Sequence, residues 1–165
     1  MVKGKQLFYE DIFKKLQQKN VEYLVIGGIA VNLYGVQRAT GDIDLLLSMD
    51  QDNLSSFISL TKELGLVPKM PVKAEELKKP EKLKEWRETK NMLVFSFAHP
   101  DNPYITIDVM NEEPLPFAEA YKRRKIMRAW GIDISTVSLG DLIKLKQISG
   151  REQDLADIEA LNKIG

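Results

Sequence analysis

The sequence predicts an α+β domain in which a mixed sheet is flanked by helices and the chain ends in a helical pair. Two observations favour this class. Short apolar runs typical of buried strands alternate with segments of helical periodicity in the first half of the chain, and alternating runs precede two helical segments in the second half. The length of 165 residues and the hydrophobic content of 44% suit one domain with its own core. We therefore expect a single domain over residues 1–165.

The first half of the chain begins with an amphipathic helix over Gln6–Gln18, because apolar residues recur at helical spacing between lysines. A run of Tyr, Leu, Val and Ile that ends at two glycines predicts a buried strand over Glu22–Ile26, and a short helix follows over Ile29–Tyr34. The run DIDLLL predicts a second strand over Asp42–Leu47. Helical spacing before a glycine predicts a helix over Gln51–Leu64.

The segment Lys69–Lys90 differs in character, because it contains eight Lys or Arg and five Glu with little apolar periodicity. We interpret it as an exposed, charged excursion with a short helix over Glu81–Glu88. Two alternating runs, Met92–Ala98 and Tyr104–Met110, then flank a turn rich in Pro and Asn. This arrangement predicts a hairpin.

The last third of the chain is predicted to contain a short helix, two short strands and the helical pair. Ser138 precedes the first long helix as a candidate N-cap, with Asp141 in the capping-box position, and Gly150 separates this helix from the last one. The C-terminal helices thus occupy residues 138–165. In chain order, the elements are Phe117–Tyr121, Ile126–Trp130, Ile132–Ile134, Leu139–Ser149 and Glu152–Lys163.

Charge and composition exclude several classes of protein. The 24 basic residues balance the 24 acidic ones, which argues against a protein that coats nucleic acid. With no cysteine, the chain has neither disulfides nor a thiolate metal site. It has no apolar stretch near the roughly 18 residues that cross a bilayer, and its first residues lack a signal-peptide core. We expect a cytoplasmic protein with no membrane partner.

Two glycines and three aspartates form the sharpest candidate site. Gly27 and Gly28 end a strand and open a helix, where backbone N–H groups favour phosphate and the absence of a Cβ lets an anion approach. Asp42 and Asp44 share one face of the next strand, where two like charges repel unless a cation lies between them. Asp108 lies mid-strand among apolar residues and needs compensation for its charge. Such oxygen ligands suit Mg²⁺ or Mn²⁺, and Asp108 is also a candidate base.

Arg38, Thr40 and Lys146 are candidate phosphate contacts. Arg38 brings a delocalised charge and Thr40 a hydroxyl donor to the loop before the aspartates. Alternatives stay open for each: Arg38 as a surface residue, Thr40 as a turn hydroxyl, and Lys146 as a partner in solvated ion pairs with acids of the last helix. The basic segment Lys122–Arg128 is interpreted as a solvated face rather than a contact for nucleic acid.

The Gly27-Gly28 turn, the Asp42-x-Asp44 pair and Asp108 on a later strand resemble the minimal nucleotidyltransferases of the DNA polymerase beta-like superfamily. The match spans Val21–Asp44, Ile105–Val109 and Ser138–Leu161.

One branch of that superfamily is especially similar. Arg38-x-Thr40 directly before the aspartate pair resembles the branch associated with abortive-infection and toxin–antitoxin systems. The C-terminal part adds to the likeness, because members of that branch often carry a Lys-rich helix followed by Gly-Arg and an Asp-Leu-x-Asp-Ile helix.

The resemblance implies a polymerase-palm-like sheet and a site for two Mg²⁺ ions. It also implies transfer of a nucleoside monophosphate from an NTP to a hydroxyl acceptor, with release of pyrophosphate. By position, Asp42, Asp44 and Asp108 would hold the ions, Gly27 and Gly28 would cradle the phosphates, and Lys146 would lie near the triphosphate. The acceptor is left open among nucleic acid, protein and small molecule.

The sequence departs from the superfamily at two glycines. Gly28 stands where a phosphate-binding Ser is frequent, and Gly41 stands where a Ser often precedes the first Asp. These departures motivate an alternative function: a weakly active or inactive nucleotide-binding regulatory module, such as an antitoxin-like partner of another protein.

Overall fold

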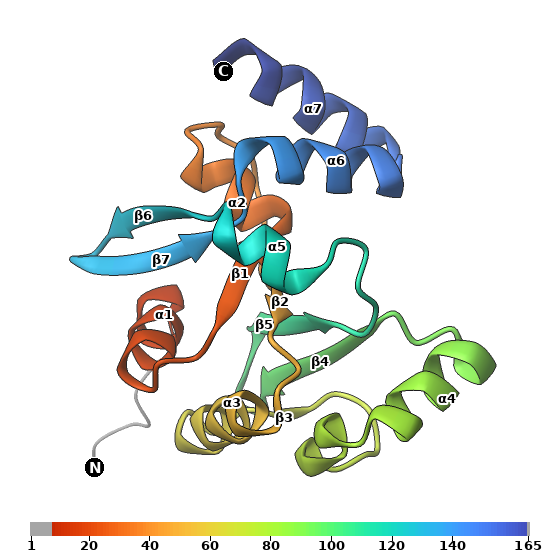
Figure 1. Cartoon of the computed structure of the whole chain (residues 1–165). Coiled ribbons are helices and arrows are strands. Elements are labelled where there is room, and N and C mark those ends of the chain that lie inside the picture. Colours follow the sequence, from red (N-terminus) through yellow and green to blue (C-terminus); the bar gives the residue numbers. More distant parts are fainter. Residues whose placement is uncertain (1–7, 165) are drawn as a thin grey trace.

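The computed structural model describes residues 8–164 and places seven strands of that range in one mixed sheet, in the order β3-β4-β5-β2-β1-β7-β6 (Figure 1). The strands are β1 (Tyr23–Ile26), β2 (Asp42–Leu47), β3 (Val67–Pro68), β4 (Val94–His99), β5 (Asn102–Met110), β6 (Lys125–Ala129) and β7 (Ile132–Thr136). The helices are α1 (Tyr9–Gln18), α2 (Gly27–Leu33), α3 (Gln51–Glu63), the 3₁₀ helix η1 (Ala74–Lys78), α4 (Pro80–Lys90), α5 (Phe117–Lys122), α6 (Leu139–Ser149) and α7 (Glu152–Ile164).

The middle of the sheet is formed by β1, β2 and β5. Strand β2 runs antiparallel to β1 and parallel to β5, whereas β1 runs parallel to β7. The outer pairs β4·β5 and β6·β7 are antiparallel hairpins. All four residues of β1 are buried, as expected for a short apolar run in the centre of a covered sheet. The α+β class with a mixed sheet is therefore confirmed.

Aromatic side chains connect the helices to the sheet. Phe57 of α3 meets Phe97 of β4 edge to face, with ring centroids 5.6 Å apart, and Phe13 of α1 lies 6.5 Å from the ring of Tyr23 in β1. The C-terminal pair α6 and α7 packs at the far end of the molecule, next to α2 (Figure 1). The predicted helical pair is thus confirmed.

Most predicted bounds agree with the structure within two residues. The start of the first predicted helix, Gln6 and Leu7, lies outside the described residues, and α1 begins at Tyr9. Helix α2 begins at Gly27 rather than at Ile29, so both glycines belong to its first turn. The two-residue strand β3 was not predicted, because Val67 and Pro68 are too short a run to show alternation.

The charged segment 69–90 is less exposed than the sequence indicates. Leu77, Leu83 and Trp86 are buried, and the Trp86 ring lies 6.1 Å from that of Phe95 in β4. The prediction of an exposed excursion is wrong for this face of η1 and α4. These three buried residues stand among thirteen charged ones and give no visible helical period, yet they anchor the segment.

No helix within residues 8–164 combines the length and the apolar character needed to cross a bilayer.

Candidate active site

Asp44 and Asp108 lie side by side on the two parallel strands at the centre of the sheet. The register pairs Asp44 of β2 with Asp108 of β5, and Asp42 with Thr106. Alternation places all four side chains on one face. Asp44 and Asp108 are both partly buried, whereas Asp42 is exposed at the start of its strand. The structure therefore brings the three predicted aspartates to one region of one face.

The two paired aspartates cannot both ionise freely. Burial, followed by the charges of Asp108 and Asp42, raises the pKa of Asp44 to about 7. Burial also raises the pKa of Asp108, although a hydrogen bond with Ser96 opposes the rise. A hydrogen bond between Asp44 and Asp108 also opposes this rise in the pKa of Asp108. Near neutral pH the pair thus tends to retain a proton in the absence of a cation.

Asp42 is held apart from this pair. Its Oδ1 accepts a hydrogen bond from the Thr106 hydroxyl at 2.5 Å. Among residues 8–164, no group of three or more His, Cys, Asp or Glu side chains is gathered closely enough to hold a metal ion. What the structure shows is a close pair of carboxylates with a third one tethered nearby.

The donor set nevertheless fits a hard divalent cation. All three groups offer carboxylate oxygen, which Mg²⁺ and Mn²⁺ prefer. The pKa of Asp44 is raised by burial first and by the charges of Asp108 and Asp42 second, and a cation would oppose both causes. Asp42, Asp44 and Asp108 are therefore the residues that would hold such an ion.

Gly27 and Gly28 have a packing role that the sequence did not reveal. Gly27 has a φ of +68°, and a Cβ there would lie 2.1 Å from Oδ2 of Asp44. A Cβ on Gly28 would lie 2.5 Å from Oγ1 of Thr40. The anion that approaches Gly27 in this structure is therefore the carboxylate of Asp44 itself, and the loop before β2 packs against Gly28.

The loop that carries Arg38 and Thr40 is fixed from two sides. Arg38 Nη1 donates to Asp157 Oδ2 of α7 at 2.8 Å. The Tyr9 hydroxyl donates to the backbone oxygen of Gly41 at 2.9 Å and to that of Thr40 at 3.3 Å. Arg38 is thus engaged in an ion pair rather than left as a surface residue.

Lys146 is buried rather than solvated. Its side chain is 7% exposed, and its Nζ lies 3.2 Å from Asp154 and 2.9 Å from Asp157. Arg151 pairs with Asp154 at 3.0 Å from the solvent side. The interpretation of Lys146 as part of a solvated pair is therefore wrong, because these charges lie between α6 and α7. The positive charges of Lys146 and Arg151 also act on Asp44, where they oppose the rise in its pKa.

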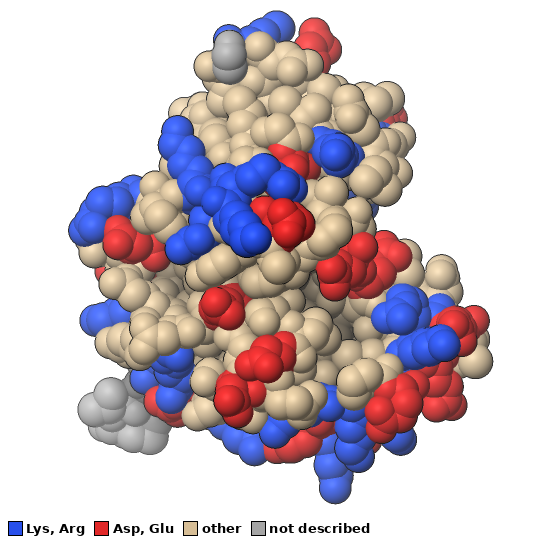
Figure 2. All heavy atoms as spheres, viewed as in Figure 1, with Lys and Arg blue, Asp and Glu red and all other residues tan. Residues whose placement is uncertain are grey.

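Lys and Arg side chains gather around α5 and β6 (Figure 2). Within the basic segment, Arg123 forms a two-pronged ion pair with Asp141, at 2.9 and 3.3 Å. Arg128 pairs with Asp133 at 2.6 Å. Acidic neighbours therefore offset part of the charge of residues 122–128.

Three residues of this region were not predicted as part of the site. Thr106 and Ser96 contact Asp42 and Asp108, and strand alternation could have indicated them, because both occupy the face of the aspartates. Tyr9 lies 32 positions from Gly41 in the sequence. No local pattern could have indicated that contact.

A mixed sheet that presents paired aspartates beside a Gly-Gly helix start is the arrangement that the resemblance to nucleotidyltransferases implies. The family described as a nucleotidyltransferase of unknown function (DUF6036) matches residues 7–164, and the chain belongs to this family. No curated protein matches the sequence.

Solved structures of nucleotidyltransferases share the fold. The lincomycin-bound lincosamide antibiotic adenylyltransferase LnuA is 18% identical, with a TM-score of 0.60 over 98% of this chain and 100% of its own. ANT(2″)-Ia, in complex with adenylyl-2″-tobramycin, is 14% identical, with a TM-score of 0.60 over 94% of this chain and 87% of its own. A putative nucleotidyltransferase from Thermotoga maritima is 16% identical, with a TM-score of 0.56 over 93% of this chain and 88% of its own.

These matches confirm the resemblance to minimal nucleotidyltransferases in both family and fold. They do not confirm the likeness to the toxin–antitoxin branch, which remains a prediction.

Proposed function

We propose that the protein is a Mg²⁺-dependent nucleotidyltransferase that moves a nucleoside monophosphate from an NTP to a hydroxyl acceptor. The observation that carries this proposal is the register of Asp44 against Asp108 on neighbouring parallel strands, directly beside Gly27. The raised pKa of Asp44 adds support, because a buried carboxylate beside two further carboxylates is suited to a cationic partner.

The proposed transfer exchanges one phosphorus–oxygen bond for another. The acceptor hydroxyl oxygen forms a bond to the α-phosphorus of the NTP, the bond between that phosphorus and the oxygen bridging to the β-phosphate breaks, and pyrophosphate leaves. Asp108 is proposed to accept the hydroxyl proton, because it lies beside Asp44 on the central strands and burial raises its pKa. Bound Mg²⁺ or Mn²⁺ would supply charge neutralisation at the phosphates.

The other proposed roles belong to binding and positioning. Thr106 holds Asp42 in place at 2.5 Å. Thr40 and the first turn of α2 at Gly27 and Gly28 are proposed to contact the phosphates. Arg38 and Lys146 are proposed to supply positive charge from their ion pairs with α7, as a background field rather than as direct ligands.

A small molecule is the proposed class of acceptor. One structure of similar fold is a lincosamide antibiotic adenylyltransferase bound to lincomycin, and another, ANT(2″)-Ia, is in complex with adenylyl-2″-tobramycin. The balanced net charge of the chain does not favour a polyanionic acceptor. We also propose that this reaction takes place in the cytoplasm.

The alternative is a nucleotide-binding regulatory module with little or no turnover, which acts through a protein partner in an antitoxin-like manner. The observation in its favour is that Arg38 and Lys146 are already paired with acids of α7. Fewer cations are then available for a triphosphate. The two functions differ in product formation, not in nucleotide binding.

A transfer assay distinguishes them. The protein is incubated with labelled NTPs, Mg²⁺ and a panel of hydroxyl acceptors, and pyrophosphate release and labelled product are measured. We expect Mg²⁺-dependent product that is lost in Asp44→Asn and Asp108→Asn and kept in the control Asp101→Asn, whose exposed side chain lies in the β4–β5 turn. Nucleotide binding without product would favour the regulatory module.

A further inference from the structure

A pocket lies at the carboxyl ends of β2 and β5, next to the candidate site. Leu46 follows Asp44 by two residues and Met110 follows Asp108 by two, and both line this pocket. Strand alternation therefore places Leu46 and Met110 on the same face as the aspartates, about 7 Å farther along the strands. These two residues join the pocket to the face that carries the carboxylate pair, whereas Leu54 and Leu83 of its lining come from α3 and α4, which pack against the opposite face.

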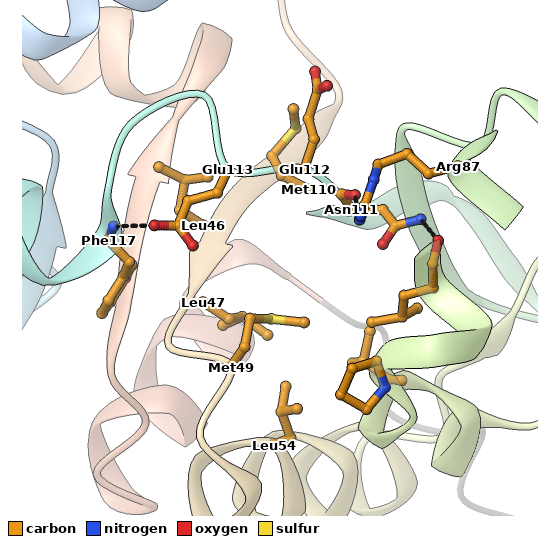
Figure 3. A pocket seen from close by; sticks show the side chains of 13 residues that line it. Leu46, Leu47, Met49, Leu54, Arg87, Met110, Asn111, Glu112, Glu113 and Phe117 are labelled. Carbon is orange, nitrogen blue, oxygen red and sulfur yellow. Dashed lines mark hydrogen bonds between the residues drawn. The ribbon is translucent and has the colours of Figure 1, made fainter. Parts of the chain in front are cut away.

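The pocket has the size and lining of a small-molecule site. Its volume is about 420 Å³, within the usual range of roughly 300–1,000 Å³ for such sites. Figure 3 shows it between α3, α4 and the segment that follows β5. Its apolar lining includes Leu46, Leu47, Met49, Leu54, Met110 and Phe117.

Asn111 places an unpaired acceptor in this apolar surrounding. Its side-chain nitrogen donates to the backbone oxygens of Leu83 at 3.1 Å and Met92 at 2.8 Å, which fixes the orientation of the amide. The residue is 4% exposed, and its Oδ1 is buried without a hydrogen-bond partner. Figure 3 shows this oxygen directed into the pocket. Because an unpaired buried carbonyl is unfavourable, a donor on a ligand would recover the free energy that is lost there.

The edge of the pocket is acidic. Glu112 and Glu113 both line it and are at least partly exposed. Figure 2 shows acidic side chains beside the hollow at the segment after β5. Arg87 is the basic residue of the lining, and it is engaged through Nη1 with the backbone oxygen of Asn111 at 2.8 Å. Two carboxylates against one engaged guanidinium favour a cationic ligand and disfavour a polyanion.

We propose that this pocket binds the acceptor, and that the acceptor is a small molecule with an apolar body, a protonated amine and a hydroxyl group. The amine lies at the acidic edge of the pocket, an N–H or O–H of the ligand donates to Asn111, and the hydroxyl extends along β5 toward Asp108. This inference rests on the proposed function, because only a transferase has an acceptor.

The test uses a simple probe, aminohexanol, and its uncharged analogue hexanol. Binding to the ¹⁵N-labelled full chain is followed by amide chemical shifts, with an expected dissociation constant on the order of 1–10 mM for so small a ligand. The double variant Glu112→Gln/Glu113→Gln should weaken aminohexanol binding about tenfold and leave hexanol binding unchanged. The Glu113→Gln substitution keeps a side-chain oxygen that can accept from the Phe117 backbone N–H, as Glu113 does in the wild type.

A second variant fills the pocket. Met49 is 39% exposed, so Met49→Trp should fold and abolish binding of both probes. Ile126→Trp is the matched control, because this exposed residue of β6 lies outside the pocket. Unchanged binding in Met49→Trp, equal binding of hexanol and aminohexanol, or shifts of the pocket amides by a single-stranded oligonucleotide would each overturn the inference.

Mg²⁺-dependent NTP binding is measured on the same samples and separates the two proposals. NTP binding without aminohexanol binding overturns the pocket inference and leaves the proposed function standing. Aminohexanol binding without any NTP binding contradicts the proposed function, and it also overturns the role of the pocket as an acceptor site. Binding of both, with NTP binding retained in Met49→Trp, supports both proposals.

Discussion

Replacement of Asp44 by asparagine should stabilise the metal-free protein at alkaline pH. Folding raises the pKa of Asp44 from 3.8 to about 7, so between these values the folded state keeps a proton that the unfolded chain has lost. The stability of the wild type therefore falls as pH rises through this window. At about 1.4 kcal/mol for each pKa unit, the full penalty above pH 7 is on the order of 4 kcal/mol. Asparagine has no charge to bury, so the Asp44→Asn variant does not have this free-energy penalty.

The assay is thermal unfolding in the presence of a chelator. For a chain of this size, about 1 kcal/mol shifts Tm by roughly 2–4 °C, so Asp44→Asn should unfold about 10 °C above the wild type near pH 8. The difference should shrink near pH 5, where Asp44 of the folded wild type keeps its proton. Added Mg²⁺ should raise the Tm of the wild type but not of the variant. An Asp44→Asn protein less stable than the wild type near pH 8 without metal would refute the reasoning. Asp101→Asn should show none of these effects.

Two further predictions concern packing around the site. Gly28→Ala should cost about 1–3 kcal/mol of unfolding free energy, because its Cβ would lie 2.5 Å from Oγ1 of Thr40 and 2.9 Å from its Cβ. The control Gly140→Ala, whose Cβ would meet nothing within 4 Å, should stabilise α6 by up to about 1 kcal/mol. Lys146→Met should cost about 3–5 kcal/mol, because it leaves Asp154 and Asp157 buried with a partner missing. The exposed Lys144→Met should change stability by no more than about 0.5 kcal/mol. Urea unfolding measures all four variants; equal effects within either pair would contradict the corresponding packing account.

The fold was largely predictable, because its main elements depend on local patterns. The alternation of DIDLLL predicts both the bounds of β2 and the common face of Asp42 and Asp44. A hydroxyl before a helical pattern predicts the N-cap of α6, where the Ser138 side chain accepts from the Asp141 backbone N–H. By contrast, the anchoring of η1 and α4 depends on which apolar residues meet the sheet, and composition alone does not contain that information.

The candidate site was predictable in its residues and less so in its contacts. Strand faces indicate which aspartates share a side of the sheet, whereas the pairing of β2 with β5 depends on strands that are separated by 54 residues, 48–101. Lys146 and Arg38 were selected for their charge, but in the fold both form ion pairs with acidic residues of α7. A sequence pattern identifies a cation without revealing which anion it contacts.

Calorimetric titration of the wild type with each NTP, in Mg²⁺ and in chelator, tests the central claim most directly. The claim is that Asp44 and Asp108 form a metal-dependent nucleotide site. It predicts that at least one NTP binds in Mg²⁺, that binding disappears in chelator, and that Asp44→Asn and Asp108→Asn lose it while remaining folded. Binding that is equally strong with and without Mg²⁺, or that survives in both variants, would contradict the claim.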